Sequence, residues 1–301
     1  MSDKKRTTTI TRRQFIKDTS IAAIGSTLFL GAPGSVFSKS GKTTPVVLVR
    51  NKDVLDANGK PKFPVVLEML DTAVTALTGK KDPTTAWKSI IKPDDIVGIK
   101  SNVWSYIPTT KQVEEVLKKR VMDAGVSEAD IKIRDRGIYN DPFFKKTTAL
   151  INARPLRTHH WSGVGSLLKN YITFVPDPSS YHGDTCADLA KLWFLPPVKG
   201  KTRLNVLVLL TPQFYGVGPH SFNPKYVWKY YGFLVGFDPV AVDSVGVRIL
   251  LAKRKDYFAE DRPINPPPKH IFLADTRHHL GTADPKKIDL IKIGYDKDIF
   301  V

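Results

Sequence analysis

Short apolar runs alternate with amphipathic stretches through the first third of the chain, and this order constrains the fold more than any other feature. Residues 46–49, 96–99 and 131–133 are short, largely apolar runs of the kind found in buried strands. Between them, residues 65–77 and 110–125 carry apolar side chains at helical spacing. A strand–helix–strand–helix–strand order predicts right-handed βαβ units and therefore a parallel sheet covered by helices.

The second half of the chain is less regular. Residues 140–200 are rich in His, Asn and Pro and are less regular than the rest of the chain. Residues 206–210 predict a fully buried strand, and residues 226–235, which are aromatic and β-branched, favour another. The Asp-Pro pair at 238–239 predicts a helix start, with Asp as N-cap and Pro in the first helical position. A last strand is predicted at residues 290–293. We therefore expect a single large α/β domain with a mixed, mostly parallel sheet flanked by helices.

The N-terminal segment has the features of an export signal. Arg12 and Arg13 follow a basic start and precede an apolar run of about ten residues, too short for a bilayer that needs about 20. Adjacent arginines in this setting are similar to a twin-arginine signal. The sequence predicts a signal peptide over residues 1–38, a linker over 39–44 and a domain over 45–301. The protein would then be exported folded by the twin-arginine translocase to the periplasm or another extracytoplasmic space, with the signal either cut or kept as an anchor.

The charge of the chain restricts its partners. The formal net charge is +17, and removal of residues 1–38, which hold six basic and two acidic residues, leaves +13. Outside the cytoplasm nucleic acid is not an expected partner, so the basic balance favours an anionic small molecule, anionic lipid or a wall polymer. A solvated basic surface that serves solubility alone is the alternative.

A single cysteine, Cys186, restricts the cofactors. One thiol cannot form an internal disulfide, hold an iron–sulfur cluster or build a thiolate zinc site within this chain. A cofactor would have to be held by His, carboxylate, Asn or backbone groups, which leaves a divalent metal open.

Four polar clusters interrupt the apolar elements, and α/β proteins bind ligands at the carboxyl ends of their strands. Lys100 and Asn102 form the first, directly after the strand predicted at 96–99. The ammonium would neutralise an anion and the amide would orient it. An ordinary loop at a strand end is the alternative.

The second cluster is the richest in cations. Arg157 and His159 precede a Gly-Val-Gly-Ser turn, and Lys169 and Asn170 follow it. Arg, Lys and His suit a phosphate or a carboxylate, and a turn ahead of a helix would add backbone N–H donors. The turn matches neither a Walker loop nor a dinucleotide-binding fingerprint.

The third cluster contains His182 and Asp184, with Cys186 nearby. His and Asp can hold a divalent metal, and His can act as a general base. A lone loop histidine without a special role is the alternative. No partner at a fixed spacing supports Cys186 as a nucleophile.

The fourth cluster pairs Asp238 with Asp243 on the helix predicted after residue 238. Five residues turn about 140° around a helix, so the two carboxylates do not share a face and a glycosidase pair is not supported. Asp238 is explained as a cap. Asp243 lies within an apolar stretch and needs a partner, for which Lys100, Arg157 or Lys169 are candidates.

Taken together, these motifs resemble a prokaryotic family known as domain of unknown function 362. The most specific is the stretch GFDPVAVD at residues 236–243, and the resemblance spans about residues 45–295. The other matching stretches are residues 95–102, 157–159, 168–170, 182–189 and 216–219. The resemblance implies an α/β fold, sometimes exported by the twin-arginine route and sometimes fused to ferredoxin modules, with no agreed reaction. The chain departs from the family pattern at Arg157, where Lys is usual, and at Thr211-Pro212, where an Asp-Gly pair is frequent.

We expect the strand-end loops to converge on one polar pocket for an anionic small molecule. In an enzymatic version, a hydrolase or a transferase that a metal could assist, His159 or His182 would be the general base or a metal ligand. The residues expected to bind substrate are Lys100, Asn102, Arg157, Lys169, Asn170, Asp238 and Asp243, and the candidate metal ligands are His182 and Asp184. The alternative is a non-catalytic envelope binding protein, or an accessory subunit for an envelope redox partner. The Thr211-Pro212 departure and the absence of further cysteines favour this alternative.

Overall fold

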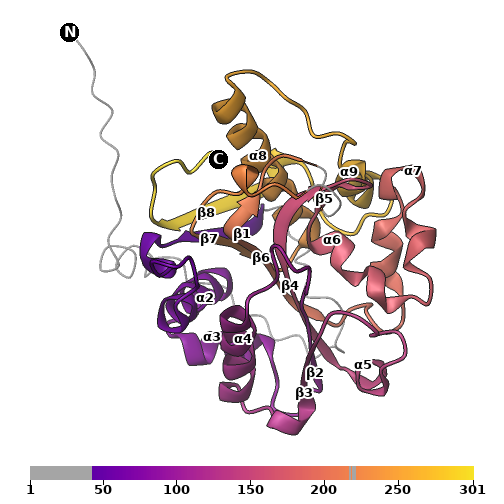
Figure 1. Ribbon diagram of the computed structural model, residues 1–301. Coiled ribbons are helices and arrows are strands. Elements are labelled where there is room, and N and C mark those ends of the chain that lie inside the picture. The colour runs from indigo at the N-terminus through magenta and orange to yellow at the C-terminus, as the bar shows by residue number, and fades with distance from the viewer. Residues whose placement is uncertain (1–42, 217, 219–221) are drawn as a thin grey trace. The chain divides into compact units, whose positions relative to one another are not determined.

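The computed structural model describes residues 43–216, 218 and 222–301, in which helices lie on both faces of one sheet (Figure 1). The predicted export signal, with Arg12 and Arg13, and the linker up to residue 42 lie outside the described residues. The strands are β1 (Thr44–Arg50), β2 (Val97–Lys100), β3 (Ile131–Arg134), β4 (Ala149–His159), β5 (Gly163–Gly165), β6 (Thr202–Gln213), β7 (Gly232–Gly236) and β8 (Ile288–Gly294).

The sheet has the order β3-β2-β4-β6-β7-β1-β8, and β5 pairs with β4 outside this path. Strand β7 runs antiparallel to both of its neighbours and β5 runs antiparallel to β4, whereas the remaining pairs are parallel. The prediction of a mixed, mostly parallel sheet in an α/β fold is confirmed.

Each face of the sheet has its own apolar core. Along β1, Val46 and Leu48 belong to one core and Val47 and Val49 to the other, as the alternation of a strand requires. Helices α2 (Phe63–Thr78), α3 (Pro83–Ile90) and α4 (Lys111–Asp123) cover the second core. The first core lies under the other helices, namely α5 (Pro142–Lys146), α6 (Leu167–Asn170), α7 (Gly183–Cys186), α8 (Pro239–Phe258) and α9 (Lys269–Thr276).

Short 3₁₀ turns join these elements, at Lys52–Val54, Glu128–Asp130, Tyr171–Phe174, Pro178–Tyr181, Leu189–Phe194, Pro224–Tyr226 and Pro285–Lys287. Within the described part of the chain, no helix combines the length and the apolar character that a membrane crossing needs.

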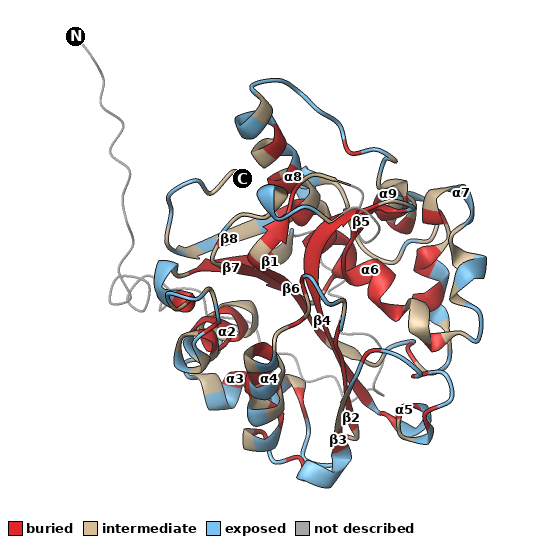
Figure 2. Cartoon of the chain, in the orientation of Figure 1, coloured by how far each residue is buried: buried red, intermediate tan, exposed pale blue. Residues whose placement is uncertain are grey.

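Strand β4 was missed by the sequence analysis, although it is the strand that carries most of the site. All eleven of its residues are buried, and Figure 2 shows it as a long red strand within the sheet. Its sequence hides it because Asn152, Arg154 and Arg157 interrupt the apolar positions and Pro155 argues against a central strand. A register irregularity lies between Pro155 and Arg157, which is how the sheet accommodates the proline.

Two other boundaries differ from expectation. Strand β7 covers only Gly232–Gly236, because Tyr226 ends a 3₁₀ turn and Tyr231 has a positive φ of 61°. The helix start at Asp238 is confirmed, since its side chain accepts hydrogen bonds from Val240 N and Ala241 N.

The difference in length between β2 and β4 sets the position of the site. Lys100, the last residue of β2, pairs with Asn152, so β4 extends seven residues beyond β2. Residues Ala153–His159 therefore project past the carboxyl end of β2, which is the edge where parallel sheets bind ligands.

Candidate functional site

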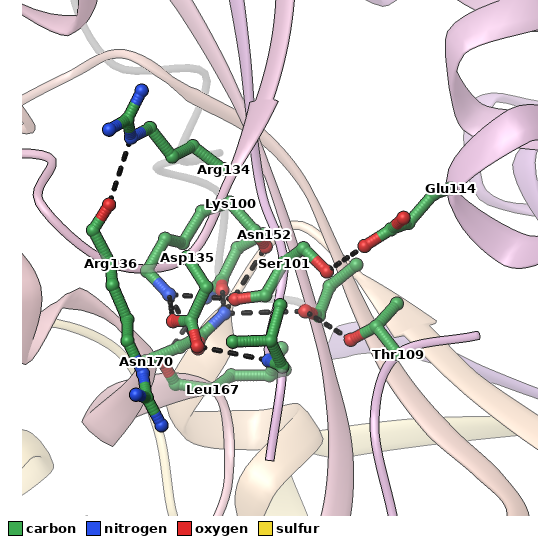
Figure 3. Close-up of polar contacts among 12 residues, drawn as sticks. Lys100, Ser101, Thr109, Glu114, Arg134, Asp135, Arg136, Asn152, Leu167 and Asn170 are labelled. Atoms are coloured by element: carbon green, nitrogen blue, oxygen red, sulfur yellow. Dashed lines mark hydrogen bonds and ion pairs between the residues drawn. The ribbon is translucent and has the colours of Figure 1, made fainter. Parts of the chain in front are cut away.

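A buried lysine anchors the polar groups behind this edge (Figure 3). Lys100 is fully buried, and its Nζ donates to Ser101 O at 2.7 Å and Asn170 Oδ1 at 3.1 Å and forms an ion pair with Asp135 at 2.5 Å. Asp135 Oδ2 in turn accepts from Val103 N. Burial lowers the pKa of Lys100 to about 8, and Asp135 opposes this effect. All three ammonium donors of Lys100 are thus used within the protein.

Three asparagines extend this network across the sheet. Asn170 Nδ2 donates to Asn152 Oδ1 at 2.7 Å, and Asn152 Nδ2 donates to Asn205 Oδ1 at 3.2 Å. Asn205 Nδ2 ends the chain of hydrogen bonds at the carbonyl of Phe237, just before α8. Lys100 and Asn170, predicted to bind substrate, therefore lie in a network that joins β2, β4, β6 and the start of α8.

The partner of Asp243 is not one of the cations expected from the sequence. Its carboxylate is fully buried and accepts hydrogen bonds from Ser166 Oγ (2.7 Å), Leu167 N (3.0 Å) and Leu168 N (2.9 Å). The prediction of Lys100, Arg157 or Lys169 as its partner was wrong, because backbone N–H groups at the start of α6 satisfy it. Burial raises the pKa of Asp243 to about 6 against these hydrogen bonds.

Asp238 is likewise held by backbone groups. Its Oδ1 caps α8, and its Oδ2 accepts from Thr282 N at 2.8 Å. A Cβ at Gly281 would stand 2.0 Å from Oδ1, so the loop at 281–282 closes directly on this carboxylate. Both oxygens thus fix the start of α8, and neither is offered to a ligand.

Two arginines of β4 lie side by side at Gly165 of β5. An added Cβ at Gly165 would stand 2.2 Å from Arg157 Nη1 and 3.0 Å from Arg154 Nη2, so glycine leaves the space that both guanidinium groups occupy. Residues three apart on a regular strand face opposite sides, and the irregularity between Pro155 and Arg157 removes that alternation. Arg157 also lies over the ring of Trp104, with its Cζ 4.3 Å from the ring centroid.

Lys169 completes a set that we call the buried cationic cluster: Arg154, Arg157 and Lys169. The three are only 3–4 % exposed, and none forms an ion pair with a carboxylate of the described residues. Burial and the neighbouring charge of Arg154 together lower the pKa of Arg157 well below its ordinary value. Burial lowers the pKa of Arg154 to about 10. Asp135 and Asp243 oppose these shifts without contacting either guanidinium group.

Several donors of the cluster lack partners. Arg154 Nε and both Nε and Nη1 of Arg157 are buried without a hydrogen bond to any described residue. Buried polar groups are nearly always hydrogen-bonded, and a guanidinium left without partners is especially costly. The arrangement is therefore unfavourable for the protein alone and suited to an anion.

Three histidines surround the cluster as neutral imidazoles. Burial, followed by the charges of Lys169, Arg154 and Arg157, strongly lowers the pKa of His159. Burial and Lys169 lower the pKa of His182 to about 4 and that of His270 to about 3. His159 Nδ1 accepts a hydrogen bond from Trp161 N at 3.2 Å, so the ring proton lies on Nε2 and His159 is a donor there. The predicted role of His159 as a general base does not fit this tautomer.

The pH dependence of stability tests whether His270 is a neutral imidazole in the folded protein. His270 is fully buried, and neither ring nitrogen has a hydrogen-bond partner among the described residues. At pH 7.5 it is neutral in both states. At pH 5 it is protonated only in the unfolded chain, so stability is lost as pH falls below about 6.5. Between these pH values the wild type should lose about 2 kcal/mol more unfolding free energy than His270→Leu, by urea titration in chloride buffers. Parallel pH profiles of the two proteins would contradict a buried neutral imidazole.

The other residues predicted for the site are Asn102, His182 and Asp184. Asn102 is buried, and its Oδ1 has no partner among the described residues, so it stays a candidate. His182 packs against Trp161, with ring centroids 4.1 Å apart, at the half-exposed margin of the cluster. Asp184 forms an ion pair with Lys269 instead of joining His182. Within the described ranges, no three His, Cys, Asp or Glu side chains come together as metal ligands.

Two cavities lie elsewhere. One of about 770 Å³ reaches this region only at Thr158, and its wall residue Arg254 has three donors bound by the carbonyls of Phe214, Arg262 and Pro263. The other, of about 250 Å³, is almost entirely apolar and is lined by none of the cluster residues. We assign the chemistry to the cluster because two neighbouring buried guanidinium groups there have donors without partners.

Four site residues were missed from the sequence: Asp135, Asn152, Arg154 and His270. Asp135 directly follows β3, so the rule of polar residues at strand ends would have found it. The other three had no such signal. Asn152 and Arg154 depended on recognising β4, and His270 is brought in by α9 from more than a hundred residues away.

Comparison with known proteins supports the family resemblance over part of the chain. Residues 138–248 match the family described as Domain of unknown function (DUF362). This range contains β4, α6 and the first half of α8, and thus Arg154, Arg157, Lys169 and Asp243. Searches of the curated proteins and of the solved structures found no match. The chain is thus similar to this family over residues 138–248, and no reaction follows from the match.

Proposed function

We propose that this protein binds an anionic small molecule through Arg154, Arg157 and Lys169. The observation that supports this most is the pair of buried guanidinium groups at Gly165 with unpartnered N–H donors and no contacting carboxylate. Guanidinium groups bind carboxylate or phosphate oxygens in a bidentate manner, and these bonds strengthen away from water. The Nε2–H of His159 would add a neutral donor.

The network behind the cluster supplies its rigidity. Asn152 precedes Arg154 by two residues on β4, and Asn170 follows Lys169 on α6, so the asparagine hydrogen bonds hold both elements that carry the cations. Side chains fixed in this way lose little conformational freedom on binding. Lys100 and Asn170 therefore serve the site by positioning it.

Thermal unfolding in the presence of different anions tests the proposal. At constant ionic strength, phosphate, oxalate and sulfate should raise the melting temperature in a saturable manner that chloride does not reproduce, because a ligand bound only by the native state stabilises it. Equal melting temperatures in all of these salts would refute the proposal.

We further propose that the protein acts outside the cytoplasm, after export by the twin-arginine translocase. The support is the Arg12-Arg13 pair with its basic and apolar flanks. Replacing both arginines by lysine should hold the precursor in the cytoplasm, measured by fractionation. Undiminished delivery of this variant to the envelope would refute export by this route. An envelope redox partner, for which this chain would be an accessory subunit, is a narrower version of this proposal.

A non-catalytic binding protein remains the simplest form of the function. Of the groups predicted for a hydrolase or transferase, His159 is a donor at Nε2 and Asp184 pairs with Lys269, so neither supports a metal-assisted reaction. The proposal therefore uses no metal.

A further inference from the structure

We propose that Lys169 is a nucleophile that forms a Schiff base with an anionic aldehyde or ketone, such as a 2-oxo carboxylate. The inference deepens the proposed function and depends on it, since the cationic cluster would hold the anionic end of the same ligand. The ligand would be a carbonyl compound with an adjacent negative charge, and it would be bound covalently.

Among the described residues two lysines, Lys100 and Lys169, are buried, and their surroundings are opposite. Lys100 has an ion pair with Asp135 and two further oxygen acceptors, which hold its ammonium group in the charged state. Lys169 has no carboxylate partner among the described residues, and its Nζ donates to Cys186 Sγ at 3.7 Å. Burial raises the pKa of the Cys186 thiol, so at neutral pH this sulfur is a weak acceptor and not a counter-ion. The structure therefore stabilises the charge of Lys100 and not that of Lys169.

The neighbours of Lys169 favour its neutral amine. Burial lowers the pKa of Lys169 to about 8; Cys186 opposes this shift, and the charges of Arg154 and Arg157 add to it. Burial lowers the pKa of Lys100 to a similar value, but only Lys169 lacks a carboxylate that holds the charge among the described residues. Desolvation and neighbouring cations are the conditions under which proteins use lysine as a nucleophile toward carbonyl carbon.

Formation of the Schiff base requires neither an oxidant nor a metal. The neutral amine of Lys169 attacks the carbonyl carbon, a C–N bond forms, and the carbonyl oxygen takes up a proton as the nitrogen loses one. The resulting carbinolamine expels water as the nitrogen lone pair forms the C=N bond, so amine and carbonyl become imine and water.

His182 is suited to move the proton in this step. It lies close enough to Lys169 for that charge to lower its pKa, and its buried Nδ1 has no hydrogen-bond partner among the described residues. With a pKa of about 4 it is neutral at pH 7 and can accept a proton. Arg154 and Arg157 would bind the carboxylate next to the carbonyl carbon.

Reductive trapping tests the inference. Native protein is incubated with glyoxylate or pyruvate and sodium cyanoborohydride, and the modified lysines are located by peptide mass spectrometry. We expect Lys169 to be modified at least about tenfold faster than Lys111, whose side chain is 80 % exposed, and Lys100 to stay unmodified. Phosphate should slow the modification of Lys169 and leave that of Lys111 unchanged, and urea should abolish the preference.

Two controls separate this inference from the proposed function. Lys169→Arg removes the amine and should lose the trapped product at this position, while Lys111 is modified at its wild-type rate. Wild-type protein that phosphate stabilises, but in which Lys169 reacts no faster than Lys111, would overturn the nucleophile and leave the anion site standing. Absence of both trapping and stabilisation would overturn both.

Discussion

Asparagine in place of Asp135 is expected to lower the free energy of unfolding by about 3–5 kcal/mol, because it removes the only carboxylate in contact with Lys100 among the described residues. Lys100 is fully buried at the end of β2, so its charge cannot reach water without opening the sheet. The new amide can keep an oxygen for Val103 N, but its NH2 group then faces the ammonium of Lys100, so the hydrogen bond to Lys100 is lost together with the charge. Urea denaturation followed by circular dichroism measures the effect.

Two comparisons isolate the cause. Adding Lys100→Met to Asp135→Asn removes the stranded ammonium and should recover at least about 1 kcal/mol of the loss, a coupling that a double-mutant cycle measures. Asp188→Asn removes the charge of a half-exposed carboxylate that pairs with Lys191, Arg277 and His278, and should change stability by about 0.5 kcal/mol or less. A loss below about 1 kcal/mol for Asp135→Asn would show that the ammonium of Lys100 is not held by this carboxylate.

Arg157→Met is expected to act in opposite directions on stability and on binding. The guanidinium is buried without a contacting carboxylate, so an apolar side chain of similar length should raise the free energy of unfolding of the unliganded protein by about 1–2 kcal/mol. The same change removes charge-assisted hydrogen bonds to the ligand and should weaken anion binding about 100-fold. Isothermal titration with phosphate and urea denaturation in chloride buffer give the two quantities.

Arg254 is the matched control. It is equally buried, but its three bonded nitrogens donate to backbone carbonyl groups. Arg254→Met should therefore destabilise the fold by about 2–4 kcal/mol and leave phosphate affinity unchanged. If Arg157→Met destabilises the protein as much as Arg254→Met does, Arg157 is structural and the anion site is misplaced.

Local rules correctly predicted most of the framework. The helices at 63–78 and 111–123 and the short strands at 97–100 and 131–134 follow from apolar periodicity, and the start of α8 follows from the Asp-Pro pair. Arg157, His159 and Lys169 were grouped because they lie close together in the sequence, and in the structure the charges of Arg157 and Lys169 act on His159.

The rest depended on tertiary structure. Asn152 and Arg154 are polar residues of the kind found in loops, but both lie in β4, a central strand that includes a proline. Asn152 is hydrogen-bonded there to Asn205. The sequence alone does not indicate which group will bond to a buried carboxylate. Asp243 was therefore expected to pair with a cation, whereas in the structure backbone N–H groups donate to it. Lys100 and Lys169 looked alike, and only their neighbours show that one is neutralised and the other is not.

Diffraction from crystals grown with selenate, recorded at the selenium absorption edge, would locate an anion directly. We expect an anomalous peak within hydrogen-bonding distance, about 3 Å, of the guanidinium nitrogens of Arg154 and Arg157 beside Gly165. Guanidinium groups hydrogen-bonded to other parts of the protein, with no selenium peak at Gly165, would contradict the anion-binding site.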